Sequence, residues 1–104
     1  MFIETKNWTA QISQLPDSEF FRTDGTVIVP HAGVTPRLVM TPIQDKSFNL
    51  RLELKLDVID EPAAQIRVEK SVEYVASGKS NVTGVDIFFE GALLHHIDTI
   101  IMPR

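Results

Sequence analysis

The sequence predicts an all-β protein, an antiparallel β-sandwich or small barrel of six to seven strands with at most one or two short helices. Runs rich in Val, Ile, Leu, Phe and Thr are separated by six prolines and five glycines, a pattern that is typical of short strands connected by turns. One long run, residues 48–59, alternates strictly between apolar and polar side chains. In addition, no segment carries the long amphipathic pattern of a helix that connects parallel strands.

Composition predicts one domain in a reducing compartment. The 104 residues, of which 43% are hydrophobic and 23% charged, match a single globular domain, so we treat 1–104 as one β domain. The chain contains no cysteine, which excludes thiolate metal sites and cysteine nucleophiles. Because small secreted domains usually depend on disulfides, this absence favours a cytoplasmic protein. No run approaches the roughly 20 apolar residues of a membrane-spanning helix.

The N-terminal third predicts two strands and a helical turn. Residues 2–12 alternate between apolar and polar side chains towards their end, as a strand does. Residues 17–22 predict one helical turn, because an aspartate cap follows a proline and a glycine comes soon after. Residues 26–29 form a short apolar strand that Pro30 ends. We expect a loop over 31–36.

The middle of the chain contains the clearest element. Residues 37–44 predict a strand, and Pro42 places it at a sheet edge or interrupts it, because proline cannot donate to a ladder. In residues 48–59 every even position is apolar and nearly every odd position is polar. This pattern predicts a strand with one buried face and one solvent-exposed face. Twelve residues extend over about 40 Å, about twice a typical strand. Such a strand should bend or wrap two sheets.

We expect a turn at 60–63, after which residues 66–74 return beside the long strand as its hairpin partner. Both strands must bury their apolar face on the same side, which restricts the register. Among the two registers close to the turn, one opposes like charges, and the other places Lys55 opposite Glu69. Opposite charges across a ladder are the favourable arrangement, so we predict the second register.

The last two strands are expected over 85–90 and 93–102, with Gly91 between them. A two-residue turn at Glu90 and Gly91 would place Phe89 opposite Ala92, and Asp86 opposite His95. The rival geometry is one long strand that is kinked at Gly91.

Lys70 departs from the pattern, because it occupies an inward position of the returning strand. One interpretation is an ammonium buried against a ligand or a carboxylate. The other is a side chain that extends to the sheet edge or is turned outward by a bulge. We favour the second, since a buried unpaired charge costs several kcal/mol.

The histidines do not form a metal site in this pattern. His95 and His96 are adjacent in a predicted strand, so their side chains point to opposite faces and do not chelate one ion. His96 and Asp98 share a face. The chain has no nucleophile elbow and no phosphate-binding glycine loop. We therefore expect no metal, no cofactor and no enzymatic activity.

The net charge of −4 and the scattered basic residues argue against nucleic-acid binding. We predict a protein-binding or self-associating module whose partner is a second copy of the chain or another protein, and neither a nucleic acid nor a membrane. The alternative is a small-ligand-binding β-barrel with a pocket lined by Lys70 and His95 or His96. The candidate ligand-binding residues are Lys70, His95, His96 and Asp98.

Overall fold

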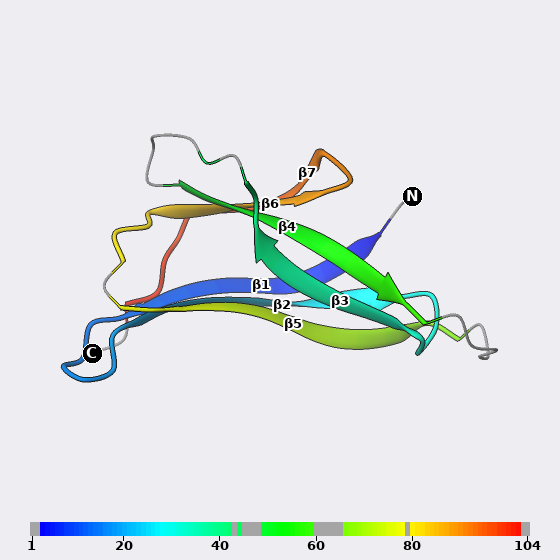
Figure 1. Ribbon diagram of the computed structural model, residues 1–104, viewed down its shortest axis with the longest axis horizontal. Helices are drawn as coiled ribbons and strands as arrows, with labels where there is room; N and C mark the ends of the chain where they lie inside the picture. Colours follow the sequence, from blue (N-terminus) through cyan, green and yellow to red (C-terminus); the bar gives the residue numbers. More distant parts are fainter. Residues whose placement is uncertain (1–2, 43, 45–48, 60–65, 79, 103–104) are drawn as a thin grey trace.

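The structure of the protein is a computed structural model that describes residues 3–42, 44, 49–59, 66–78 and 80–102. Over these residues the chain forms seven strands and no helix, arranged in two layered sheets (Figure 1). The prediction of a small β-sandwich is confirmed, and the sheets do not close into a barrel. The strands are β1 (Glu4–Ser13), β2 (Phe20–Val29), β3 (Val34–Met40), β4 (Asn49–Val58), β5 (Val68–Ser77), β6 (Gly84–Phe89) and β7 (Ala92–Ile97).

One sheet has the order β1-β2-β5 and the other has the order β3-β4-β6-β7. All neighbouring strands run antiparallel except β4 and β6, which are parallel. This pair departs from the predicted antiparallel arrangement. It arises because the chain leaves β4, forms β5 in the other sheet and then returns as β6. Parallel neighbours need such a long crossover connection.

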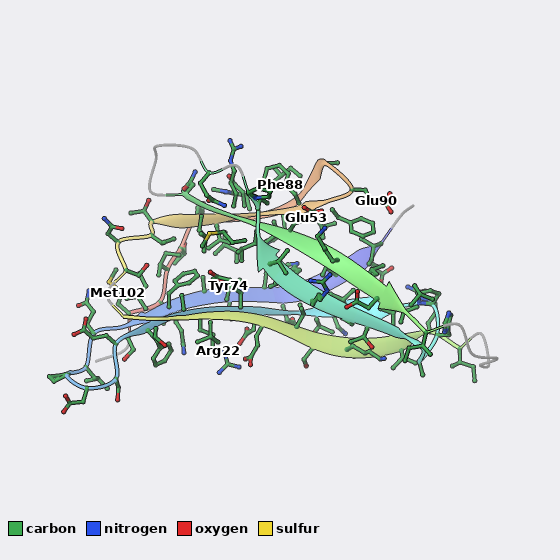
Figure 2. All side chains as sticks on the ribbon, viewed as in Figure 1. Arg22, Glu53, Tyr74, Phe88, Glu90 and Met102 are labelled. Carbon is green, nitrogen blue, oxygen red and sulfur yellow. The ribbon has the colours of Figure 1, made fainter. Side chains whose placement is uncertain are left out.

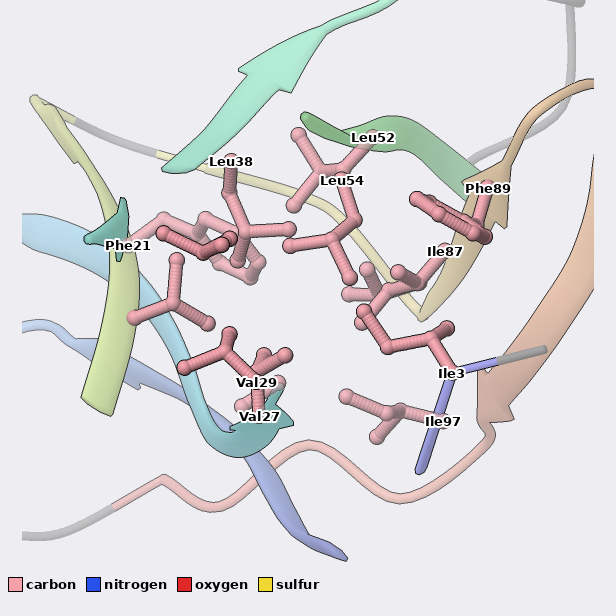
Figure 3. Close-up of a cluster of buried hydrophobic side chains, with 14 of the residues drawn as sticks. Ile3, Phe21, Val27, Val29, Leu38, Leu52, Leu54, Ile87, Phe89 and Ile97 are labelled. Atoms are coloured by element: carbon pink, nitrogen blue, oxygen red, sulfur yellow. The ribbon is translucent and has the colours of Figure 1, made fainter. Parts of the chain in front are cut away.

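The core lies between the two sheets, where the inward side chains of both layers meet (Figure 3). Full burial of one large aliphatic or aromatic side chain stabilises the fold by about 1.5–3 kcal/mol. The apolar side chains that alternation directs inward therefore stabilise the packing of the two sheets. The largest fully buried apolar side chains are Phe21, Ile12, Leu52, Leu54, Ile87, Val27, Val29 and Val85.

The predicted hairpin of the two long strands is wrong. β4 and β5 lie in different sheets, Lys55 lies opposite Arg37 of β3, and Glu69 lies opposite Ile28 of β2. Cross-strand charge pairs are worth only about 0.2–1 kcal/mol each. They cannot outweigh the burial gained when two apolar faces close over a common core. The predicted turn at 60–63 lies outside the described residues.

The helical turn predicted over 17–22 is also wrong, because β2 begins within it, at Phe20. Phe21 is buried in the core, and the burial of a large aromatic ring outweighs the weak local preference of a capped turn. The loop predicted over 31–36 overlaps β3, which is an edge strand as predicted, although Pro42 lies beyond its end.

Candidate functional site

Lys70 lies on β5, directly opposite Val27 on the inward side of the sheet. Its side chain is half-buried, and its Nζ donates a hydrogen bond to the carbonyl of Ala32 at 2.6 Å. The ammonium therefore reaches the rim of the sandwich, as the favoured interpretation predicted. β5 is an edge strand, and an inward-pointing charge on an edge strand discourages pairing with another strand.

The β6–β7 hairpin has the predicted turn but a shifted register. Phe89 lies opposite Ala92, whereas the pairing shifts by one residue between Phe88 and Ile87. The bulge places Asp86 opposite His96 instead of His95, so the predicted pair is wrong. A bulge inserts one residue into one strand, and sequence alternation does not reveal it.

The two histidines consequently face different surroundings. Nδ1 of His96 contacts Oδ1 of Asp86. The ring of His95 stacks on Trp8 of β1, with 6.2 Å between the ring centroids and an angle of 23° between the planes.

The four candidate ligand-binding residues are spread over different elements. Lys70 lies on the edge strand β5, and His95 and His96 lie on β7, an edge strand of the other sheet. Asp98 follows β7 and is exposed. Among the described residues, no group of three or more His, Asp or Glu could hold a metal ion. A ligand-binding role for these four residues stays a prediction.

A different site emerges at β4, because only part of its length lies between two strands. β6 pairs with β4 from Asn49 to Glu53, whereas β3 pairs with β4 as far as Val58. Beyond Glu53, the C-terminal half of β4 and the β6–β7 hairpin diverge (Figure 1). Over the described residues, no strand pairs with the β6-facing side of β4 after that point.

The backbone of this half of β4 has a definite orientation. The N–H of Ile59 donates to the carbonyl of Gly33 at 2.9 Å, and the N–H of Thr41 donates to the carbonyl of Arg51 at 3.1 Å. In an antiparallel ladder, alternate residues direct both backbone polar groups to the same neighbour. Odd-numbered residues of β4 therefore bond to β3. Leu56 and Val58 direct their N–H and C=O groups to the side that β6 has left open.

An apolar groove of about 510 Å³ lies along this open side. Apolar side chains form most of its surface, and Glu53 and Glu90 lie on the same side of the molecule (Figure 2). Its lining residues are Pro30, His31, Val34, Glu53, Leu54, Lys55, Leu56, Val58, Phe89 and Glu90. An unpaired strand edge beside an apolar groove offers hydrogen bonds and side-chain pockets to one extended segment.

The groove was missed from the sequence, although one signal of it was present. The alternating run over 48–59 is much longer than the apolar run over 85–90. When a long strand has a short neighbour, part of its edge stays unpaired. The identity of that neighbour, however, depends on the crossover between the sheets, which local alternation does not report.

A second hollow, of about 560 Å³, lies on the outer face of the three-stranded sheet. It is polar, and Arg22 forms ion pairs with Asp24 at 3.1 Å and with Glu73 at 3.0 Å within it. These charges compensate one another across exposed strands. The apolar groove beside β4 is the stronger candidate site, because the backbone polar groups of Leu56 and Val58 face a side on which no described strand pairs.

No protein-family model matches the chain, and no curated protein or solved structure resembles it significantly. In the described part of the chain, no helix has the length and apolar character needed to cross a membrane.

Proposed function

We propose that this chain is a protein-binding module that takes an extended segment of a partner as an additional strand beside residues 54–58. One observation carries the proposal: the C-terminal half of β4 has an open hydrogen-bonding edge that borders an apolar groove. In strand addition, main-chain hydrogen bonds supply affinity, and pockets for alternate side chains supply specificity.

The proposed partner segment has alternating character. Its inward side chains would contact Val34, Leu56 and Phe89, so they should be apolar. Its outward side chains would lie beside Lys55 and Asp57, which are exposed on the outer face of β4. Opposite charges at those outward positions would add favourable cross-strand pairs.

A linear peptide library displayed on phage tests the proposal. We expect selected peptides to alternate between apolar and polar residues and to shift the amide NMR signals of Leu56 and Val58. Val58 is 65% exposed, so Val58→Glu should leave the fold intact and weaken binding by about tenfold or more. Val75→Glu is the matched control, because Val75 is 52% exposed on the outer side of the other sheet.

Selected peptides that shift amide NMR signals of the protein outside β4, and not those of Leu56 and Val58, would contradict the proposal. So would binding that Val58→Glu and Val75→Glu weaken equally. A library from which no linear peptide is enriched would count against strand addition as well.

A further inference from the structure

We propose that the strand added beside β4 belongs to a second copy of this chain, and that the two β4 strands pair antiparallel about a two-fold axis at Leu56. The inference rests on the proposed function, because it names the occupant of the same groove. In this arrangement Leu56 lies opposite its own copy. Leu54 then lies opposite the second copy's Val58, on the inward face.

The backbone orientation of β4 suits this pairing. Leu56 directs both its N–H and its C=O to the open side, so the two copies exchange two hydrogen bonds at the axis. The N–H of Val58 then reaches the carbonyl of the second copy's Leu54, and the symmetry repeats this bond. β4 and the β6–β7 hairpin diverge here (Figure 1), and the apolar groove of about 510 Å³ lies along this open edge.

The charges on the outer face select the register. Pairing about Leu56 places Lys55 opposite the second copy's Asp57, and the symmetry makes two such pairs. Because side chains alternate between the two faces, a register that keeps the apolar residues on the inward face moves the two-fold axis by one residue along β4. The next such register towards the strand end has its axis at Asp57 and places Asp57 opposite the second copy's Asp57. Opposite charges stabilise a ladder and like charges destabilise it. Within the open half, residues 54–58, the sequence of β4 is thus complementary to itself in this register.

The surroundings of Lys55 within one copy support the same pairing. Lys55 lies directly opposite Arg37, which is an unfavourable like-charge pair. Its Nζ is 3.6 Å from Glu53 on its own strand. Asp57 is 2.8 Å from Nε of Arg37. With the second copy added, the row of charges across the outer face becomes Arg37, Asp57 and the second copy's Lys55, so that opposite charges alternate.

Three outer edges of the two sheets, those of β3, β5 and β1, carry features that oppose such pairing. On β3, Pro36 lies opposite Leu56 and lacks the N–H that an added strand would use. On β5, Lys70 points inward. The β1–β2 register shifts between Lys6 and Thr9, and Ile101 hydrogen-bonds to the backbone of β1. The C-terminal half of β4, residues 54–58, contains no proline, no register shift and no inward-pointing charge.

Sedimentation equilibrium on the full chain, at protein concentrations from about 1 μM to about 1 mM, tests the inference. The variants exchange the charges at positions 55 and 57. We expect wild type to form dimers. Lys55→Asp and Asp57→Lys should each weaken the dimer by about tenfold or more, because each change acts twice across the axis. The double variant with both changes should restore dimerisation. Lys6→Asp, the same substitution on β1 of the other sheet, should leave the dimer unchanged.

Lys55→Asp is expected to fold, because it places a carboxylate opposite Arg37. A circular dichroism spectrum like that of wild type verifies this, and the double variant provides the second control. A wild-type chain that is monomeric throughout overturns the inference. A dimer that resists both single exchanges also overturns it, and so does a double variant that fails to restore it. Peptide binding at β4 by such a monomer would leave the proposed function standing.

Discussion

The two halves of β4 share one side-chain pattern but differ in their neighbours. Leu52 and Glu53 lie between β3 and β6, whereas residues 54–58 are paired, within the described part of the chain, with β3 alone. Leu52 is completely buried, and Val58 is 65% exposed. Both are apolar residues at even positions of the same run. Alternation therefore sets the face to which a side chain points, while the neighbouring strands set how deeply it is buried.

The largest expected effect separates the buried end of β4 from the open end. Leu52→Ala should lower the free energy of unfolding by about 2–5 kcal/mol, because it leaves a cavity in a closed core. Val58→Ala should change it by less than about 0.5 kcal/mol, since little surface is lost from an exposed site. Urea denaturation followed by circular dichroism measures both. Similar losses at the two positions would show that the C-terminal half is as enclosed as the first half.

Proline substitutions sharpen the comparison between the two sides of the open half. Asp57→Pro removes a backbone donor directed to β3 and should cost about 1–3 kcal/mol, because the acceptor on β3 loses its partner. Val58→Pro removes a donor directed to the open side, where proline is tolerated, and should cost less than about 1 kcal/mol. Urea denaturation of the two variants gives this difference. A reversed order would mean that the backbone orientation assigned to β4 is incorrect.

Much of the fold was predictable because apolar alternation is a local property. Leu52 and Leu54 of β4 are buried in the core as predicted, and Lys70 reaches the sheet rim. The turn at Gly91 also occurs where its residue type requires it, with a φ of 81°, a conformation that glycine adopts at little cost. These features depend on single residues or on one strand.

The pairing of strands was not predictable in the same way. The hairpin of β4 and β5 was expected from charge pairs worth little energy, and the chain instead places these strands in separate sheets. The bulge that brings Asp86 opposite His96 is a one-residue irregularity without a signal in the alternation. The groove depends on both the crossover and the short length of β6, so its position follows from tertiary arrangement alone.

Amide hydrogen exchange, measured by NMR at a low protein concentration where the chain is monomeric, compares adjacent residues of the open half of β4. The amides of Lys55 and Asp57 bond to β3 and should exchange slowly. Those of Leu56 and Val58 face the open side and should exchange about tenfold faster or more, because they need no opening of the ladder. At high concentration a strand added to the edge should slow these two amides. Uniform exchange rates over 55–58 at dilution would contradict an open edge.

The smallest expected effect concerns the charges on the outer face of β4. Nε of Arg37 lies 2.8 Å from Asp57, and the two side chains are 51% and 56% exposed. Exposed ion pairs contribute little, and Arg37 also lies opposite Lys55, which it repels. Arg37→Ala should thus change the free energy of unfolding by less than about 0.5 kcal/mol.

A double-mutant cycle of Arg37→Ala and Asp57→Ala, measured by urea denaturation at low and high salt, isolates this pair from its surroundings. We expect a coupling energy close to zero that salt removes. A coupling well above about 1 kcal/mol would mean that outer-face charges hold the open half of β4 in place. A small coupling would mean that burial against β3 and the core holds it, which leaves Lys55 and Asp57 available for a partner strand.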